Sequence, residues 1–136
     1  MTEGGKESRD FHERYAQSLT HAQRRLECEA FGEVRGRTGY TTVEQARSLF
    51  DHLRLSSTSK VLELGAGRGW LGIYARQLRG SSVILSDRPI EALREARRYA
   101  LEARVERGVA GVCANGETLP FASGSFDAAL HSDLLC

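Results

Sequence analysis

Apolar and polar positions follow helical spacing through the first part of the chain. From Asp10 to about Ala30, apolar side chains recur every three or four residues, which predicts an amphipathic helix. A second stripe of this kind covers residues 43–53 and follows Thr41-Thr42-Val43-Glu44, a sequence typical of the capping box at a helix start. Glycines between the two predicted helices indicate an irregular loop.

Shorter apolar runs follow from residue 60 onward and alternate with helical patterns. Strands are predicted at residues 60–64 and 82–86, near residue 112 and at residues 126–131. One helical pattern begins directly after the first of these runs, and another extends from Pro89 to about Arg107. Arginines on the latter helix interleave with glutamates at i,i+3 and i,i+4 spacing, which favours a solvated, salt-bridged face over an RNA-binding one.

Three glycines at alternate positions follow the first predicted strand. The strand runs through Glu63 into Gly65-Ala66-Gly67-Arg68-Gly69, and a helix follows at once. Glycine lacks a Cβ atom, so a ligand can lie against the backbone there, and unpaired N–H groups at the helix start attract an anionic group. The turn alone leaves two cofactors open. A dinucleotide-binding spacing can be read as Gly67-x-Gly69-x-x-Gly72, but that frame leaves Gly65 unexplained.

An acidic residue ends the second predicted strand. Asp87 follows the glycine turn by about 20 positions, which is the expected place for a ribose ligand in a βαβ nucleotide site. One carboxylate can accept hydrogen bonds from both ribose hydroxyls, and each such bond contributes roughly 1.5–3 kcal/mol. The alternative is that Asp87 caps the helix that begins near Pro89, and the two roles are compatible.

The third segment carries the most specific pattern. Val112-Cys113-Ala114-Asn115-Gly116 leads to a Leu119-Pro120-Phe121 turn, and Ser125-Phe126-Asp127 opens the fourth strand. Together with Glu-x-Gly-x-Gly-x-Gly at residues 63–69 and the strand that ends in Asp87, this segment resembles the class I S-adenosylmethionine-dependent methyltransferases. The UbiE-like small-molecule branch of that family is the most similar. Dehydrogenases show no such sequence at this place.

The resemblance implies an α/β, Rossmann-like fold. This chain would supply the first four strands of a mostly parallel sheet together with N-terminal helices. Residues 1–55 would form a helical lid segment over the cofactor, with plain packing on the sheet as the alternative, and residues 56–136 would form the cofactor-binding half of a single incomplete domain. In the family's strand order, 3-2-1-4-5-7-6, the fourth strand is central. This chain stops just after the fourth strand, so we expect either a C-terminally truncated chain whose fourth strand is an exposed edge, open to self-association, or another chain that covers that edge.

The resemblance also implies S-adenosylmethionine as the cofactor and assigns residues to it. The glycine turn would lie against the cofactor, with Asp87 at its ribose and Asn115 and Gly116 at its adenine. Asn115 replaces an acidic residue of the family, but its amide can still accept and donate hydrogen bonds. The full cofactor-binding set is Glu63, Gly65, Ala66, Gly67, Gly69, Asp87, Arg88, Asn115, Gly116, Tyr40 and Thr41.

Four residues carry alternatives. Tyr40 and Thr41 could donate hydrogen bonds to the cofactor's carboxylate, or they could form only a loop with a helix cap at Thr41. Arg68 stands between two glycines, where the family often has a smaller residue, and we expect its side chain to point to solvent rather than to that carboxylate. His131 ends the fourth strand on the expected substrate side, where it could deprotonate the methyl acceptor as a catalytic base or only line the pocket.

Composition narrows the remaining possibilities. The formal net charge of +1, from 19 basic and 18 acidic residues, indicates no global attraction to nucleic acid. No segment approaches the ~18 apolar residues of a membrane span, so neither nucleic acid nor a membrane is expected as a partner. Cys28, Cys113 and Cys136 lack metal-ligand spacing, so we expect no metal. Cys113 lies in a predicted strand, and we expect it to be buried there as a small apolar residue. The odd number of cysteines favours a reducing, cytoplasmic location.

The sequence thus predicts an S-adenosylmethionine-dependent methyltransferase that acts on a small molecule. The chain would be its cofactor-binding portion. The alternative is a non-catalytic S-adenosylmethionine-binding remnant or a partner subunit.

Overall fold

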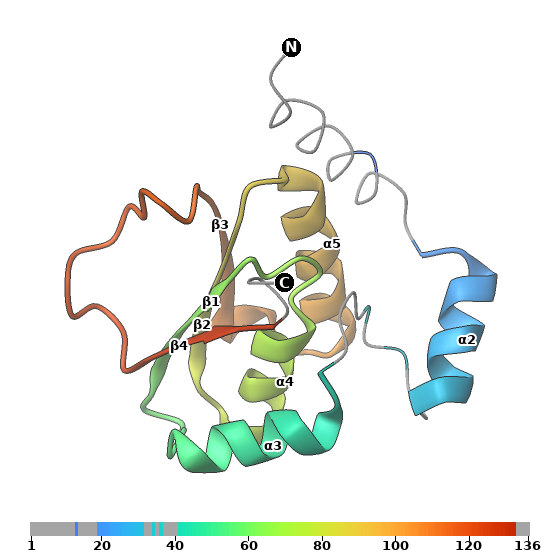
Figure 1. The fold of residues 1–136 in the computed structure, drawn as a ribbon, viewed down its shortest axis with the longest axis horizontal. Helices are drawn as coiled ribbons and strands as arrows, with labels where there is room; N and C mark the ends of the chain where they lie inside the picture. Colours follow the sequence, from blue (N-terminus) through green and yellow to red (C-terminus); the bar gives the residue numbers. More distant parts are fainter. Residues whose placement is uncertain (1–12, 14–18, 32–33, 35, 37–40, 133–136) are drawn as a thin grey trace.

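The computed structural model describes residues 13, 19–31, 34, 36 and 41–132. Within this part of the chain, four parallel strands form a sheet in the order β3-β2-β1-β4 (Figure 1). The strands are β1 (Lys60–Leu64), β2 (Ser82–Asp87), β3 (Val109–Cys113) and β4 (Ala128–His131). The expected α/β fold class and strand order are confirmed.

The register of the sheet brings the predicted site segments to one edge. Leu62 of β1 pairs with Ile84 of β2 on one side and with Ala129 of β4 on the other. Leu85 of β2 pairs in turn with Gly111 of β3. Because all pairs are parallel, the carboxyl ends of the strands lie together. The turn after β1, the end of β2 and the segment after β3 therefore share one side of the sheet.

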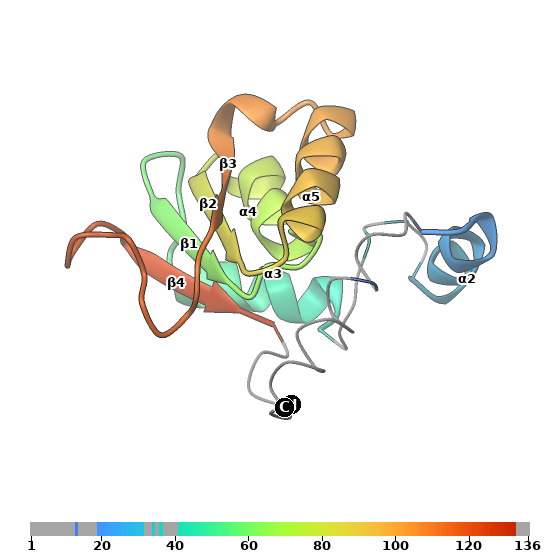
Figure 2. The same cartoon turned by 90° about the horizontal axis from the view of Figure 1, so that it is seen from above.

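Two helices connect the first three strands and cover one face of the sheet. The helix α4 (Trp70–Arg79) links β1 to β2, and α5 (Ile90–Glu102) links β2 to β3. Connections of one hand that step in the same direction along a sheet place their helices on one face, and Figure 2 shows α4 and α5 on the same side. The core lies between these layers, and its strand residues that are at most 2% exposed are Val61, Val83, Leu85 and Leu130.

The helix α3 (Val43–His52) packs beside α4. Ala46 and Phe50 of α3 are fully buried in the core, and the Phe50 ring lies 5.8 Å from the ring of Tyr74 on α4. The Arg47 Nε atom donates a hydrogen bond of 2.5 Å to the Tyr74 hydroxyl. These contacts fit the interpretation of α3 as a core helix. The helix α2 (His21–Phe31) differs, since its Leu26 is 65% exposed.

The helix starts differ in detail from those predicted. Thr42, rather than Thr41, is the N-cap of α3. Its hydroxyl accepts a hydrogen bond from the Gln45 N–H, and the Gln45 side-chain oxygen accepts one from the Thr42 N–H, which completes a capping box. The capping box therefore begins one residue later than predicted, and the alternative of a cap at Thr41 is wrong. The helix α2 begins only at His21, because Leu19 and Thr20 before it are not helical, so the predicted helix is wrong at these two residues. Residues 10–12 and 14–18 of the predicted helix lie outside the described residues.

The last connecting helix is shorter than predicted. It ends at Glu102 because Arg104 adopts a left-handed φ of 58°, and the Val105 N–H then bonds to the carbonyl of Ala100. This pattern is a C-terminal cap of the Schellman type, here with arginine in the place that usually holds glycine. A short 3₁₀ helix, η1 (Glu106–Gly108), follows before β3.

The expectation of a buried Cys113 is wrong. β3 is an edge strand, and Cys113 at its end is exposed, with its Sγ atom 3.0 Å from the Arg88 carbonyl to which it donates. Among the described residues, no helix is long and apolar enough to cross a membrane. Nor does this part of the chain hold a group of three or more His, Cys, Asp or Glu side chains that could hold a metal ion.

Candidate functional site

The glycine turn connects β1 to α4 at the carboxyl edge of the sheet. Gly65, Gly67 and Gly69 have left-handed φ angles of 59°, 54° and 73°. Side chains disfavour such angles, so the turn requires glycine at all three alternate positions, including the one that the dinucleotide spacing leaves unexplained. The Ala66 N–H bonds to the carbonyl of Ser86, which fixes the turn to β2.

The helix after the turn lies unusually close to the sheet at Gly72. A Cβ atom on Gly72 would lie 2.6 Å from Leu85, 2.7 Å from Glu63 and 2.8 Å from Val83. These distances are shorter than side chains allow, so the spacing between α4 and the sheet depends on glycine here. The glycine at this position thus serves packing between helix and strand.

Glu63 lies beneath the turn. Its carboxylate is 2% exposed, and its Oε2 atom accepts a 2.7 Å hydrogen bond from the Gly72 N–H. Gly69, the N-cap of α4, has no side chain to satisfy the first N–H groups of that helix, so Glu63 satisfies one of them from the neighbouring strand. Burial raises the pKa of Glu63 to about 8, the Gly72 N–H opposes that rise, and the charge of Asp87 adds to it.

Asp87 ties the glycine turn to the end of β2. Its Oδ2 atom accepts a 2.6 Å hydrogen bond from the Gly67 N–H, and its Oδ1 atom accepts one of 2.7 Å from the Arg88 N–H. The N-cap position of α5 is Pro89, and it has no side-chain cap, so helix capping is not the role that the structure gives Asp87. A carboxylate offers about four lone-pair sites, which leaves acceptor capacity beyond these two bonds.

The segment after β3 meets Asp87 from the other side. The Ala114 N–H bonds to the carbonyl of Asp87 at 3.0 Å, so the next residue, Asn115, follows directly beyond that contact. The Asn115 side chain accepts a 3.2 Å hydrogen bond from the Glu117 N–H. Gly116 is exposed, and the space around it is open, with no atom within 4 Å of where a Cβ would be. The structure therefore brings the second and third predicted segments to the glycine turn.

The remaining predicted residues lie around this centre or outside the described part. His131 is exposed at the end of β4 and pairs in register with Leu64, the residue before the turn. Thr41 is half-buried and precedes the N-cap of α3, and Tyr40 lies outside the described residues.

The expectation that Arg68 points to solvent is wrong. Arg68 is 5% exposed, and its Cδ atom lies 3.2 Å from where a Cβ would stand on Gly36. That same Cβ would lie 2.9 Å from the ring of Tyr99 on α5. Gly36 was expected only as one glycine of an irregular loop, and Tyr99 was not expected to take part in the site. The available signal was a long arginine side chain in a turn of glycines, which needs a partner surface when it is buried.

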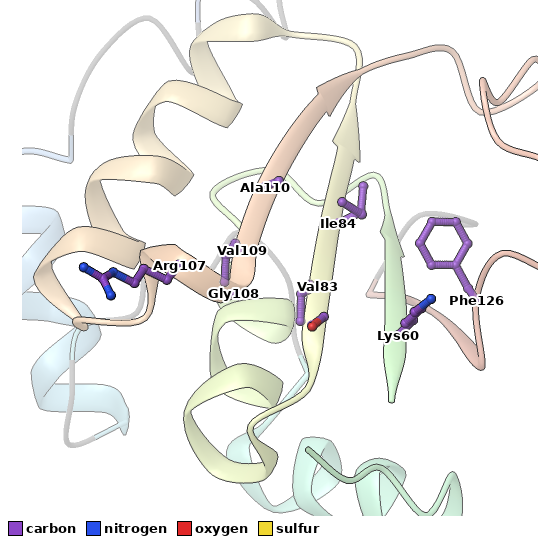
Figure 3. Close-up of a pocket in the computed structure, with 9 residues that line it drawn as sticks. Lys60, Val83, Ile84, Arg107, Gly108, Val109, Ala110 and Phe126 are labelled. Atoms are coloured by element: carbon purple, nitrogen blue, oxygen red, sulfur yellow. The ribbon is translucent and has the colours of Figure 1, made fainter. Parts of the chain in front are cut away.

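Two hollows lie away from the glycine turn. Figure 3 shows one of about 310 Å³ at the amino ends of the strands, where Lys60, Ile84 and Phe126 are among its lining residues. Another, of about 590 Å³, lies between α5 and β3. Neither is lined by the turn residues or by Asp87, so neither coincides with the predicted cofactor site.

Comparison with known proteins identifies the family. Residues 61–136 match the methyltransferase domain family, and the chain belongs to it. An uncharacterized protein of Mycobacterium tuberculosis and one of Mycobacterium bovis are each 42% identical to this chain over 73 residues. That segment is 54% of this chain but only 26% of each relative, so the chain matches about a quarter of their length.

Solved structures share the fold. A geranyl diphosphate C-methyltransferase from Streptomyces coelicolor is 27% identical, with a TM-score of 0.59 over 65% of this chain and 33% of that protein. A SAM-dependent methyltransferase from Geobacter sulfurreducens, solved with S-adenosylhomocysteine, is 20% identical, with a TM-score of 0.65 over 73% of this chain and 39% of that one. The first was also solved with S-adenosylhomocysteine, together with Mg²⁺ and geranyl diphosphate.

Proposed function

We propose that this chain is the cofactor-binding portion of an S-adenosylmethionine-dependent methyltransferase that acts on a small molecule. The observation that carries the proposal is the position of Asp87. Its carboxylate accepts a hydrogen bond from the Gly67 N–H, and its carbonyl accepts one from the Ala114 N–H. One acidic residue thus joins the three segments on which the family resemblance rests.

The residues at the carboxyl edge fit the cofactor in shape and in chemistry. Gly65, which opens the turn, is only partly buried, and the open space at Gly116 leaves room for a flat ring against the chain. In the proposed site, Asp87 accepts from the ribose hydroxyls, Asn115 and Gly116 lie at the adenine, and Arg88 flanks the ribose. Glu63 acts from beneath the turn by accepting the N–H of Gly72 in the first turn of α4.

The bound cofactor would supply an electrophilic methyl group on a sulfonium, and the chain would align the acceptor with it. Methyl transfer of this kind is an in-line displacement, to which positioning contributes several kcal/mol. His131 is the candidate for the acceptor side because it stands at the end of β4, next to the residue that precedes the turn. It takes a proton from the acceptor where the acceptor must lose one, and otherwise it lines the site.

A small-molecule acceptor is favoured by one neighbour in particular. The geranyl diphosphate C-methyltransferase shares 27% of its aligned residues with this chain. The balanced charge of the chain gives no broad basic surface for nucleic acid. Membership of the UbiE-like branch and a cytoplasmic location remain part of the proposal. A lid role for residues 1–55 also remains, with packing on the sheet as the alternative, which the buried Ala46 and Phe50 favour for α3.

Calorimetry with S-adenosylhomocysteine tests the cofactor site. Asp87→Ala should weaken binding by roughly 10- to 150-fold, because a charge-assisted hydrogen bond contributes about 1.5–3 kcal/mol. Asp127→Ala is the matched control, since that carboxylate also accepts a backbone N–H, from Lys60 at 2.8 Å, but at the opposite end of β1. Unchanged affinity with lowered stability would mean that Asp87 is only structural. A response to NAD and none to S-adenosylhomocysteine would overturn the cofactor assignment.

A methyl-transfer assay tests whether the chain by itself transfers the methyl group. The chain would be incubated with tritiated S-adenosylmethionine and geranyl diphosphate as a trial acceptor. Cofactor binding with little or no transfer supports a cofactor-binding portion, a non-catalytic remnant or a partner subunit. Efficient transfer by the chain alone would show that it is a complete enzyme.

A further inference from the structure

The glycine turn is in contact with the N-terminal segment, defined here as residues 19–31 together with Val34 and Gly36. Gly36 is buried, and its N–H donates a 3.1 Å hydrogen bond to the Glu27 carboxylate on α2. Its α-carbon faces two side chains at once, the ring of Tyr99 and the Cδ atom of Arg68. Gly36 is therefore a point where this segment lies against both the turn and α5.

The fit at Gly36 leaves no room for a side chain. A Cβ atom would lie 2.9 Å from Cε2 and 3.0 Å from Cζ of Tyr99, and 3.2 Å from Cδ of Arg68. Tyr99 is 8% exposed and its ring is covered on another side by the Arg98 guanidinium, 4.8 Å from the ring centroid. Because the ring is confined in this way, a larger residue at position 36 must displace the segment or the turn.

The positive charges that act on the Tyr99 hydroxyl come from α2, from α5 and from the glycine turn. Burial raises the pKa of the Tyr99 hydroxyl, while the positive charges of Arg24 on α2, Arg98 on α5 and Arg68 in the turn act in the opposite direction. The hydroxyl is buried without a hydrogen-bond partner among the described residues. The ring, rather than the hydroxyl, therefore provides the contact with Gly36.

We propose that Arg68 is a positioning residue that couples the docking of the N-terminal segment to the shape of the cofactor turn. Gly67 and Gly69 flank Arg68, and their N–H groups donate to Asp87 and to the Ala66 carbonyl. A shift of the Arg68 side chain away from Gly36 would therefore disturb both hydrogen bonds of the turn. This inference rests on the proposed function. Coupling is reciprocal, so a bound cofactor also favours docking of the N-terminal segment.

Hydrogen exchange and calorimetry on the full chain test the coupling. Gly36→Ala should raise amide exchange in α2 and in residues 65–72, and it should weaken S-adenosylhomocysteine binding by roughly 10-fold. Gly124→Ala is the matched control, because Gly124 also has a left-handed φ, of 75°, but nothing lies within 4 Å of its Cβ position. It should leave both the exchange of α2 and the affinity unchanged.

Arg68 and Tyr99 variants extend the test. Arg68→Ala should reproduce both effects, and the double variant with Gly36→Ala should be no worse than either single one, since both act through one contact. Tyr99→Phe should leave docking and affinity unchanged, because it keeps the ring and removes a hydroxyl that lacks a partner.

The outcomes distinguish this inference from the proposed function. Faster exchange in α2 with no change in residues 65–72 or in affinity would overturn the coupling and leave the cofactor site intact. Additive losses in the double variant would also overturn it. If the unaltered chain did not bind S-adenosylhomocysteine, the proposed function would fail. The coupling would then be tested by amide exchange in residues 65–72 without ligand. Faster exchange in the Gly36→Ala chain would support the coupling, and unchanged exchange would overturn it.

Discussion

The buried carboxyl of Glu63 should make the stability of the fold strongly dependent on pH. Burial raises the pKa of Glu63 from 4.5 to about 8. The unfolded chain therefore releases this proton at a lower pH than the folded chain. Stability attributable to the protonated carboxyl is fully present below pH 4.5 and is lost as the pH rises through about 8.

The size of this effect is large for a small fold. Each pH unit between the two pKa values corresponds to about 1.4 kcal/mol, so the loss across the whole interval amounts to roughly 5 kcal/mol. Small folds are stable by only about 5–15 kcal/mol in total. The chain should therefore be much less stable at pH 8.5 than at pH 5.

Glu63→Gln removes the titrating group and keeps its shape. The amide oxygen of glutamine can still accept the Gly72 N–H, which the carboxylate now accepts at 2.7 Å. Urea unfolding of both chains at pH 5, 7 and 8.5 would give the free energies of unfolding. We expect the variant to be within about 1 kcal/mol of the original at pH 5. At pH 8.5 it should be the more stable chain by several kcal/mol, on the order of the loss derived above.

A control and a contrary result complete the test. Glu117→Gln removes an exposed carboxylate from the loop after β3, so its pH profile should follow that of the unaltered chain. Other groups titrate equally in all three chains, and the differences between profiles cancel them. Parallel profiles for Glu63→Gln and the unaltered chain would refute the argument, because they would show that Glu63 keeps an ordinary pKa in the fold.

Three further results are expected. Gly72→Ala should destabilise the fold by about 1–3 kcal/mol in urea unfolding, because its Cβ would meet Leu85 at 2.6 Å, whereas Gly116→Ala should have little effect in open space. Phe50→Ala should lower the free energy of unfolding in urea by about 3–5 kcal/mol, because the ring is fully buried. A much smaller loss would contradict the core role of α3. The chain should self-associate through the β4 edge and transfer little methyl, and an active monomer by light scattering and tritium transfer would contradict this.

Spacing along the chain determined the order of elements and the segments that form the candidate site. The three glycines predicted a tight turn, and their left-handed φ angles show why each is glycine. The apolar runs predicted four strands, and the family resemblance supplied their order. Asp87 was predicted to lie at the glycine turn because it follows the turn by about 20 residues. Its hydrogen bond with the Gly67 N–H shows that it lies beside the turn. Such features depend on local conformation and periodicity, which a sequence records directly.

Contacts between distant segments were decided only by the tertiary structure. Arg68 was expected in solvent because its local sequence names no partner, but it is buried, and its Cδ atom lies beside Gly36, which is 32 positions earlier in the chain. Cys113 looked like a core residue by its apolar neighbours, yet β3 stands at an edge of the sheet. Burial depends on what packs against a residue in three dimensions, and neither periodicity nor composition carries that information.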